Sequence, residues 1–90
     1  MENIIKKLSQ SFLFDLKFEL TSIFENINVY KKGTKEILMS MYVNYNKIRN
    51  RYSYVDLRKR TIKHKENFVS KKELNKVIDN LILNPKKQYF

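Results

Sequence analysis

The chain has 90 residues, a net charge of +10 and no cysteine. This length allows one small domain, residues 1–90, and the absence of cysteine excludes a disulfide framework and a thiolate metal site. Apolar residues make up 42% of the chain, which is too high a share for a disordered tail. No apolar run is long enough for a signal peptide or a membrane span, so we expect a cytoplasmic protein without a membrane partner.

The positive charge is distributed unevenly along the chain. Residues 1–30 hold three basic and four acidic side chains, a net charge of −1, whereas residues 31–90 hold 16 basic and five acidic side chains, a net charge of +11. A strongly basic segment of this kind favours a polyanionic partner. The alternative is a solvated basic surface that keeps a small protein soluble.

Residues 3–28 carry apolar side chains at spacings of three and four, which is typical of an α-helix. The stripe consists of Ile5, Leu8, Phe12, Leu16, Leu20, Ile23 and Ile27. Gly33 follows two lysines, and a glycine of this kind often caps the C-terminus of a helix. We therefore predict a long helix within residues 1–30, which serves as the central element of the domain or as the contact between two copies.

Two shorter helices are predicted next. Thr34 suits the N-cap of the first of them, which is expected to end between Asn46 and Asn50. Ser53 and Asp56 resemble a capping box, which predicts a second helix over residues 54–64. Residues 65–69 are interpreted as a turn. The apolar face of the first helix comprises Ile37, Leu38, Met41, Tyr42 and Tyr45.

The segment from Ser70 onwards has the strongest helix signals of the chain. Ser70 and Glu73 form a full capping box, and Pro85 forbids continuation of the helix. The last nine residues, 82–90, are predicted to form two short strands around a polar turn. The apolar face of the helix consists of Leu74, Val77, Ile78 and Leu81.

This order of elements resembles a winged helix-turn-helix domain over residues 34–90. The residues that carry the resemblance are Ile37-Leu38 with Met41-Tyr42, Val55 with Leu57, and Leu74 to Leu81 followed by Ile82-Leu83. The arrangement is most similar to a shortened regulator of the multiple-antibiotic-resistance family, or to a small plasmid or phage DNA-binding protein. The expected fold is therefore mainly α with a small β-hairpin. The long N-terminal helix would make a homodimer, because no C-terminal dimer helix follows the wing.

The resemblance implies sequence-specific binding of double-stranded DNA. The helix over residues 70–82 would enter the major groove, and the wing over residues 83–90 would contact the backbone or the minor groove. The protein would then act as a transcriptional regulator, or as an accessory protein at a plasmid or phage origin or transfer site. The implied DNA-binding residues are Ser70, Lys71, Lys72, Asn75, Lys76, Asn80, Lys86, Lys87, Gln88, Arg49, Arg51, Arg58, Lys59, Arg60 and Lys63.

Two other functions remain open at this point. Tyr42, Tyr45, Tyr52 and Tyr54 lie near arginines in the sequence, and aromatic side chains interleaved with arginine can stack the bases of single-stranded DNA or RNA. The protein could instead be a small phage-type inhibitor whose basic face docks on an acidic host protein. An enzyme is not expected. The only histidine, His64, lies in a lysine run, and no nucleophile pair, metal-ligand set, cofactor motif or small-molecule site is evident.

Overall fold

The computed structural model describes residues 2–45, 50–59 and 64–87, and it contains two helices and five strands. The expectation of a mainly α fold is wrong, because an antiparallel sheet forms most of the ordered structure. The winged helix-turn-helix order of elements is therefore also wrong. The elements are α1 (Glu2–Ser11), β1 (Phe14–Leu20), β2 (Phe24–Lys31), β3 (Ile37–Tyr45), β4 (Asn50–Asp56), β5 (Glu66–Val69) and α2 (Lys71–Leu83).

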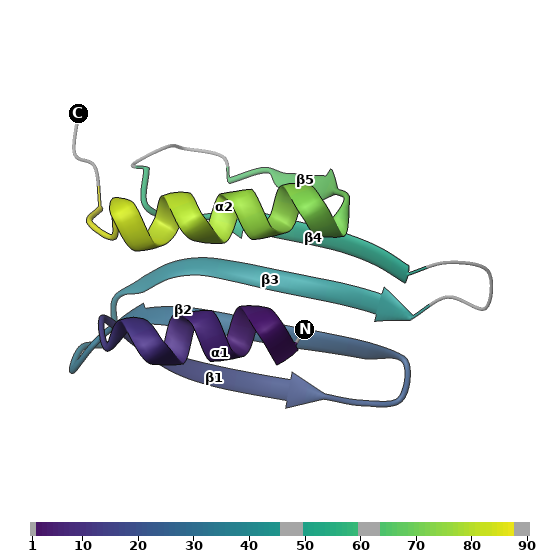
Figure 1. Cartoon of the computed structure of the whole chain (residues 1–90), viewed down its shortest axis with the longest axis horizontal. Helices are drawn as coiled ribbons and strands as arrows, with labels where there is room; N and C mark the ends of the chain where they lie inside the picture. The colour runs from purple at the N-terminus through teal and green to yellow at the C-terminus, as the bar shows by residue number, and fades with distance from the viewer. Residues whose placement is uncertain (1, 46–49, 60–63, 88–90) are drawn as a thin grey trace.

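The strands form a meander in the order β1-β2-β3-β4-β5, in which every neighbouring pair is antiparallel (Figure 1). One irregularity interrupts the ladder between Val29 and Tyr30 of β2, where the register to β3 shifts. The two edges of the sheet are β1 and the short strand β5. Strands that are consecutive in the sequence are neighbours in the sheet, so the topology needs no crossover.

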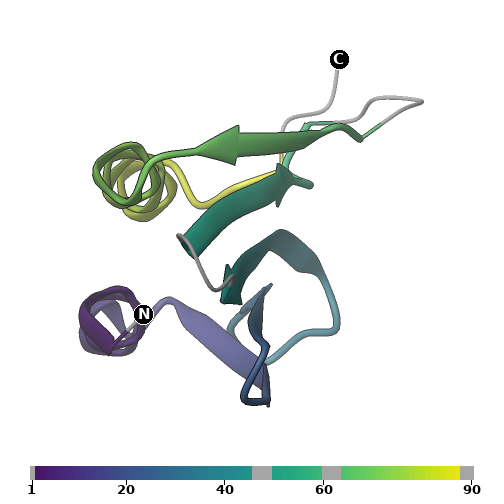
Figure 2. The same ribbon diagram turned by 90° about the vertical axis from the view of Figure 1, so that its right-hand side faces the viewer.

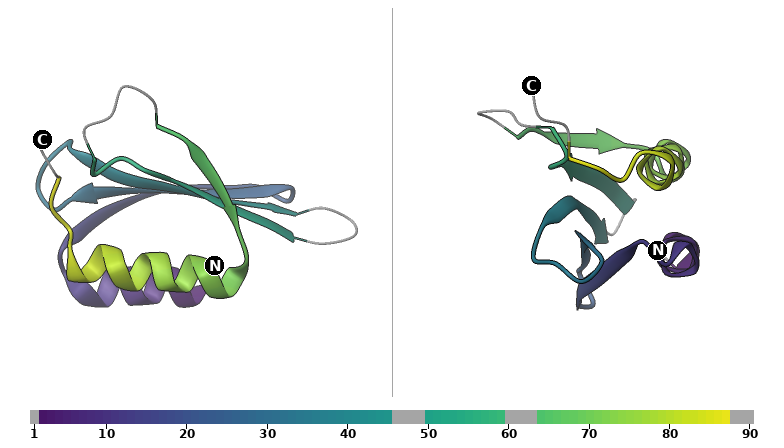
Figure 3. Two further views of the ribbon diagram at one scale, coloured as in Figure 1. Left: turned by 90° about the horizontal axis from the view of Figure 1, so that it is seen from above. Right: turned by 90° about the vertical axis from the view of Figure 1, so that its left-hand side faces the viewer.

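Both helices lie on the same face of the sheet, next to each other, and they run in the same direction (Figures 1 and 2). Seen from above, they form a single layer under the twisted sheet (Figure 3). The buried core fills the space between this layer and the sheet, and no helix of the described residues covers the opposite face. The core consists of Ile4, Leu8, Phe14, Ile27, Val29, Leu38, Met39, Met41, Leu74, Ile78 and Leu81.

The long N-terminal helix predicted for residues 3–28 is replaced by α1, β1 and β2. The sequence of β1 alternates apolar and polar side chains, which is the period of a strand. A spacing of four residues, as between Phe12, Leu16 and Leu20, fits a helix but is also twice the strand period. The chain reverses after β1 at Thr21, whose hydroxyl oxygen accepts a hydrogen bond from the N–H of Phe24 at 3.0 Å.

The helix predicted to begin at Thr34 is replaced by β3, and residues 54–56 of the helix predicted for residues 54–64 belong to β4. Residues 46–49 and 60–63 of these predictions lie outside the described part of the chain, and Gly33 lies in the turn between β2 and β3. Gly33 has a φ of 74°, and its N–H donates to the Asp15 carboxylate at 2.7 Å. Ser53 does not cap a helix. Its hydroxyl donates to Glu66 at 2.8 Å, which joins β4 to β5. The segment interpreted as a turn, residues 65–69, contains β5.

The prediction for α2 is confirmed at its start. Ser70 is the N-cap, and its side chain accepts from the N–H of Glu73 at 3.1 Å. The helix continues to Leu83, so the predicted wing strand at Ile82-Leu83 is wrong, and residues 88–90 lie outside the described part of the chain. Within the described residues, no helix is long and apolar enough to cross a membrane.

Candidate nucleic-acid interface

The face of the sheet opposite the helices is the candidate site. Residues that lie directly opposite each other on neighbouring strands share one face, so the register gives the rows of side chains on this face. One row runs from Phe24 through Asn44 to Arg51. The adjacent row consists of Glu19, Asn26, Tyr42, Ser53 and Phe68.

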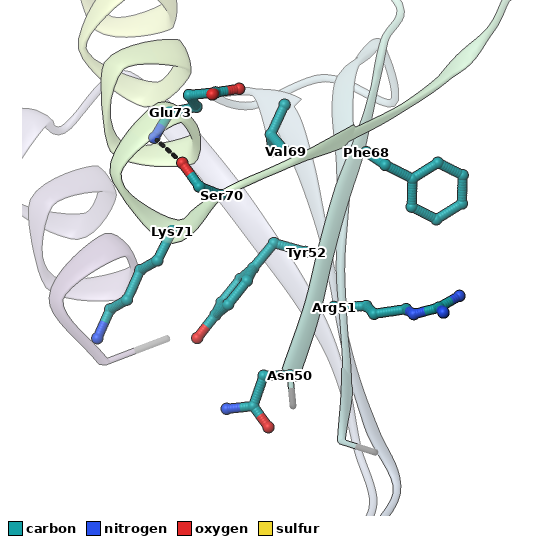
Figure 4. A pocket seen from close by; sticks show the side chains of 8 residues that line it. All are labelled: Asn50, Arg51, Tyr52, Phe68, Val69, Ser70, Lys71 and Glu73. Atoms are coloured by element: carbon teal, nitrogen blue, oxygen red, sulfur yellow. Dashed lines mark hydrogen bonds between the residues drawn. The ribbon is translucent and has the colours of Figure 1, made fainter. Parts of the chain in front are cut away.

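These rows enclose a groove near the end of the sheet where β5 leads into α2. One part of the groove is a hollow of about 400 Å³. Its lining residues are Ile23, Phe24, Tyr42, Val43, Asn44, Arg51, Ser53, Glu66 and Phe68. A second hollow of about 700 Å³ adjoins the first at Arg51 and Phe68 and continues round the end of the sheet to the helix-bearing side, where α2 begins. It is lined by Asn50, Arg51, Tyr52, Phe68, Val69, Ser70, Lys71 and Glu73 (Figure 4).

Arg51 and Phe68 line both hollows, and their side chains project in the same direction, away from α2 (Figure 4). Phe68 is 69% exposed and Tyr42 is 38% exposed. A phenylalanine this exposed in a strand does not contribute to the core of the fold. The groove therefore combines a solvent-facing aromatic ring with a guanidinium group, and both of these groups can stack on a flat base.

Two polar side chains in the row of Tyr42, those of Asn26 and Ser53, are held by hydrogen bonds. The side-chain amide of Asn26 donates to the carbonyl of Met41 at 3.1 Å, and the Ser53 hydroxyl donates to Glu66 at 2.8 Å. Asn26 and Ser53 are both buried. Of these two residues, Ser53 lines the smaller hollow, together with its acceptor Glu66.

The predicted residues of α2 lie on different sides of that helix. Lys72 and Lys76 are exposed and one helical turn apart, on the side opposite the buried stripe. Lys71 projects towards α1 and lines the part of the larger hollow that lies on the helix-bearing side (Figure 4). Asn75, the expected reader of an adenine edge, is half-buried, and its amide donates to the carbonyl of Lys71 at 3.0 Å. The predicted set is therefore not presented to a partner as one surface.

Arg58 and Asn80 have structural contacts in the fold. Arg58 is 8% exposed and donates to the Asp56 carboxylate, to the Asn80 side-chain oxygen at 3.1 Å and to the Asn84 carbonyl at 2.8 Å. These contacts occupy its guanidinium group, so Arg58 does not contribute to an exposed basic surface. Lys59 remains exposed nearby.

The other predicted residues do not gather at the groove. Lys86 and Lys87 follow the C-terminal end of α2, which lies at the opposite end of the sheet from the groove (Figure 1). Of the four tyrosines singled out, only Tyr42 lies on the open face. The register places Tyr52 and Tyr54 opposite Val43 and Met41 on the helix-bearing face. Four predicted residues lie outside the described chain: Arg49, Arg60, Lys63 and Gln88.

Phe24 and Phe68 are the aromatic residues of the groove that the sequence analysis missed. Phe68 was assigned to a turn because β5 is only four residues long. The sequence Glu66-Asn67-Phe68-Val69 does not alternate polar and apolar residues, so it carries no strand signal. The alternation of a strand is visible only in the structure, where Asn67 and Val69 are half-buried and Glu66 and Phe68 are exposed.

Tyr45, the last residue of β3, has a raised pKa. Its hydrogen bond to Glu25, followed by burial and by the negative charge of that carboxylate, raises the pKa of Tyr45 to about 12. Because the folded-state pKa is raised, this contact stabilises the protein fully below about pH 10, and the stabilisation is lost as the pH rises through about 12.

We therefore expect Tyr45 to give a late ionisation step near pH 12 in an ultraviolet absorbance titration. Tyr45→Phe should remove this late step, whereas Tyr42→Phe should leave it in place. A late step that survives in the Tyr45→Phe variant would show that another tyrosine is responsible for it.

Among the described residues, no three histidine, cysteine, aspartate or glutamate side chains gather in an arrangement that could hold a metal ion. Comparisons with models of known protein families, with curated proteins and with solved structures gave no match to this chain. The function is therefore inferred from the geometry and charge of the chain itself.

Proposed function

We propose that this protein binds single-stranded nucleic acid, RNA or DNA, in the groove on the open face of the sheet. The observation that carries the proposal is that the exposed Phe68 and Arg51 both line the two hollows and project in the same direction. Single-strand binding commonly uses aromatic rings as stacking platforms, supported by basic groups that follow the phosphate backbone. A sheet with helices on one face and exposed aromatic side chains on the other suits this mode of binding.

The charge of the chain supports a polyanionic ligand. The net charge is +10, and Lys71 and Arg51 line the larger hollow. The N-terminus of α2 lies at the same hollow and adds its partial positive charge. Glu66 and Glu73 also line the groove, but Glu66 accepts the Ser53 hydroxyl. We therefore assign base stacking to the smaller hollow on the open face, and phosphate binding to the larger hollow, which leads from Arg51 round the end of the sheet to Lys71.

Duplex DNA is the second candidate ligand, because Lys72 and Lys76 are exposed on the outer side of α2. This candidate has a steric difficulty. A helix is about 10–12 Å wide and the major groove is about 12 Å wide, so a recognition helix needs clear space on both sides. Here α1 lies beside α2, and Lys7 of α1 forms a 2.8 Å ion pair with Asp79 of α2. Contact of α2 with the phosphate backbone remains compatible with this arrangement.

The proposal predicts a loss of single-strand affinity when the groove is altered. Phe68→Ala and Arg51→Ala should each weaken binding of a fluorescent single-stranded oligonucleotide by about 10- to 100-fold, because base stacking contributes roughly 1–3 kcal/mol per base. Fluorescence anisotropy at about 100 mM salt measures this change. Lys35→Ala is the matched control for charge, because Lys35 is exposed in the turn between β2 and β3 at the far end of the sheet.

The same assay with duplex DNA tests the second candidate. If α2 carries the binding, Lys72→Ala with Lys76→Ala should weaken duplex binding while Phe68→Ala leaves it unchanged. If neither form of nucleic acid binds at about 100 mM salt, both candidates fail, since even non-specific binding reaches about 10⁻⁴–10⁻⁶ M. An acidic protein partner would then be the better hypothesis.

A further inference from the structure

We propose that two copies of this chain pair through the free edge of β1 and form a homodimer with one continuous sheet. In this structure β1 is an edge strand of seven residues. Its apolar side chains become more exposed along the strand, from the buried Phe14 to Phe18 at 48% and Leu20 at 59%. A long edge strand with exposed apolar side chains is a template for pairing with another strand. This inference does not depend on the proposed function.

The backbone of β1 offers its hydrogen-bonding groups at alternate residues. Two hydrogen bonds flank the strand in the β1–β2 register: Lys32 N–H to the Leu13 carbonyl at 3.1 Å, and Thr21 N–H to the Phe24 carbonyl at 2.9 Å. Because bonded residues alternate in an antiparallel pair, the odd-numbered residues of β1 bond to β2. The N–H and C=O groups of the even-numbered residues therefore point towards the free edge. These residues are Phe14, Leu16, Phe18 and Leu20.

One antiparallel register of β1 with a second β1 satisfies both the backbone and the side chains. In this register Phe18 lies opposite Phe18 of the partner subunit, so the twofold axis passes between them. Leu16 then lies opposite the partner's Leu20, and the outward N–H and C=O groups bond to each other. On the open face, Lys17 lies opposite the partner's Glu19, and Glu19 lies opposite the partner's Lys17. Opposite charges at directly opposed positions stabilise a strand pair.

The neighbouring registers are less favourable. A shift by two residues in either direction places like charges opposite each other. In one direction Lys17 lies opposite the partner's Lys17, and Asp15 lies opposite the partner's Glu19. In the other direction Glu19 lies opposite the partner's Glu19. Like charges at opposed positions destabilise a sheet. A shift by four residues pairs Asp15 with Lys17, but the Asp15 carboxylate already accepts the N–H of Gly33 at 2.7 Å. That register also leaves the exposed Leu20 without a strand partner.

The dimer also has a defined orientation of its faces. A twofold axis between two antiparallel edge strands stands perpendicular to the sheet, so both copies keep their helices on the same side. The open faces join into one surface, on which the two grooves face the same direction. The dimer contact would thus come from residues 14–20, a segment expected from sequence to be part of a dimerisation helix.

Charge exchange between positions 17 and 19 tests this register. Sedimentation equilibrium should show wild-type protein as a dimer. Lys17→Glu and Glu19→Lys should each weaken the dimer by about 10- to 100-fold, because each turns two attractive pairs into two repulsive ones. An equimolar mixture of the two single variants should form a heterodimer, and the double variant Lys17→Glu/Glu19→Lys should dimerise again. Lys35→Glu is the control for a change in net charge.

Circular dichroism identifies any variant that fails to fold. The rescue by mixing provides an independent test, because a misfolded chain would not regain a dimer when mixed with another variant. A wild-type protein that stays monomeric at several hundred micromolar would overturn the proposal. Single variants that dimerise like wild type, or a mixture that stays monomeric while both variants are folded, would overturn the register.

Discussion

Arg58→Ala should lower the free energy of unfolding by about 3 kcal/mol, near the lower end of the range for breaking a buried ion pair. The Arg58 side chain is 9% exposed, and it connects the end of β4 with the C-terminal turn of α2 through the Asn84 carbonyl at 2.8 Å. Its removal would leave the carboxylate of Asp56 without its charged partner. The Asp56 side chain is 22% exposed and can recover part of its hydration, which is why we expect the lower end of the range.

The pKa of Asp56 also depends on the opposing effects of burial and of the contact with Arg58. Burial alone would raise the pKa of the Asp56 carboxyl, but the hydrogen bonds and charge of Arg58 outweigh burial and hold the pKa below its usual value. Urea denaturation measures the loss of stability, with Lys59→Ala as the control because Lys59 is the exposed neighbour in sequence. A domain of this size is stable by about 5–15 kcal/mol, so the expected loss is a large fraction of the total. A change in Arg58→Ala below about 0.5 kcal/mol, the usual size for a surface substitution, would show that this network does not stabilise α2.

Leu81→Ala should cost about 2–5 kcal/mol of stability, whereas Leu83→Ala should cost less than about 0.5 kcal/mol. Leu81 is fully buried in the core, and Leu83 is 83% exposed, although the two leucines are two residues apart on α2. The difference follows from the helical period, which rotates the two side chains to different sides of the helix. Thermal or urea unfolding of the two variants compares the same chemical change in two environments. Equal losses in both variants would mean that α2 packs on the sheet with a different face.

Local signals in the sequence predicted α2 well. The Ser70–Glu73 capping box and the apolar stripe define a helix that is independent of the rest of the fold, and the structure has both the Ser70 cap and the buried stripe. The C-terminal boundary was less accurate. Pro85 prevents helix at that position, but the helix continues to Leu83 and leaves no residues for the predicted strand.

The sheet was not predicted because the apolar spacing in residues 12–20 fits two periods. The spacing of four between Phe12, Leu16 and Leu20 is typical of a helix, and the same positions alternate with polar residues as in a strand. The decisive information is non-local, since β1 is a strand because β2 lies beside it. The same holds for β3, where Met41 and Tyr42 were assigned to one helical face but lie on opposite faces of the sheet.

The candidate site was predicted only in part. Arg51 and Tyr42 were included in the tyrosine–arginine alternative, and they line the same hollow. Phe68 was not found, because it is brought to Arg51 by the pairing of β4 with β5, which the sequence pattern does not reveal. Arg58, in contrast, was predicted to contact DNA but has a structural role. A basic residue in a basic segment suggests a partner, but this one is buried against Asp56 and the end of α2.

The most direct test of the proposed function is a nuclear magnetic resonance titration of the ¹⁵N-labelled protein with a short single-stranded oligonucleotide. The proposal predicts that the largest amide shifts occur at the groove, at Asn44, Arg51 and Phe68, with small shifts at Lys72 and Lys76 on the outer side of α2. Largest shifts at Lys72 and Lys76 with an unaffected groove, or no shifts at any of these residues, would contradict it.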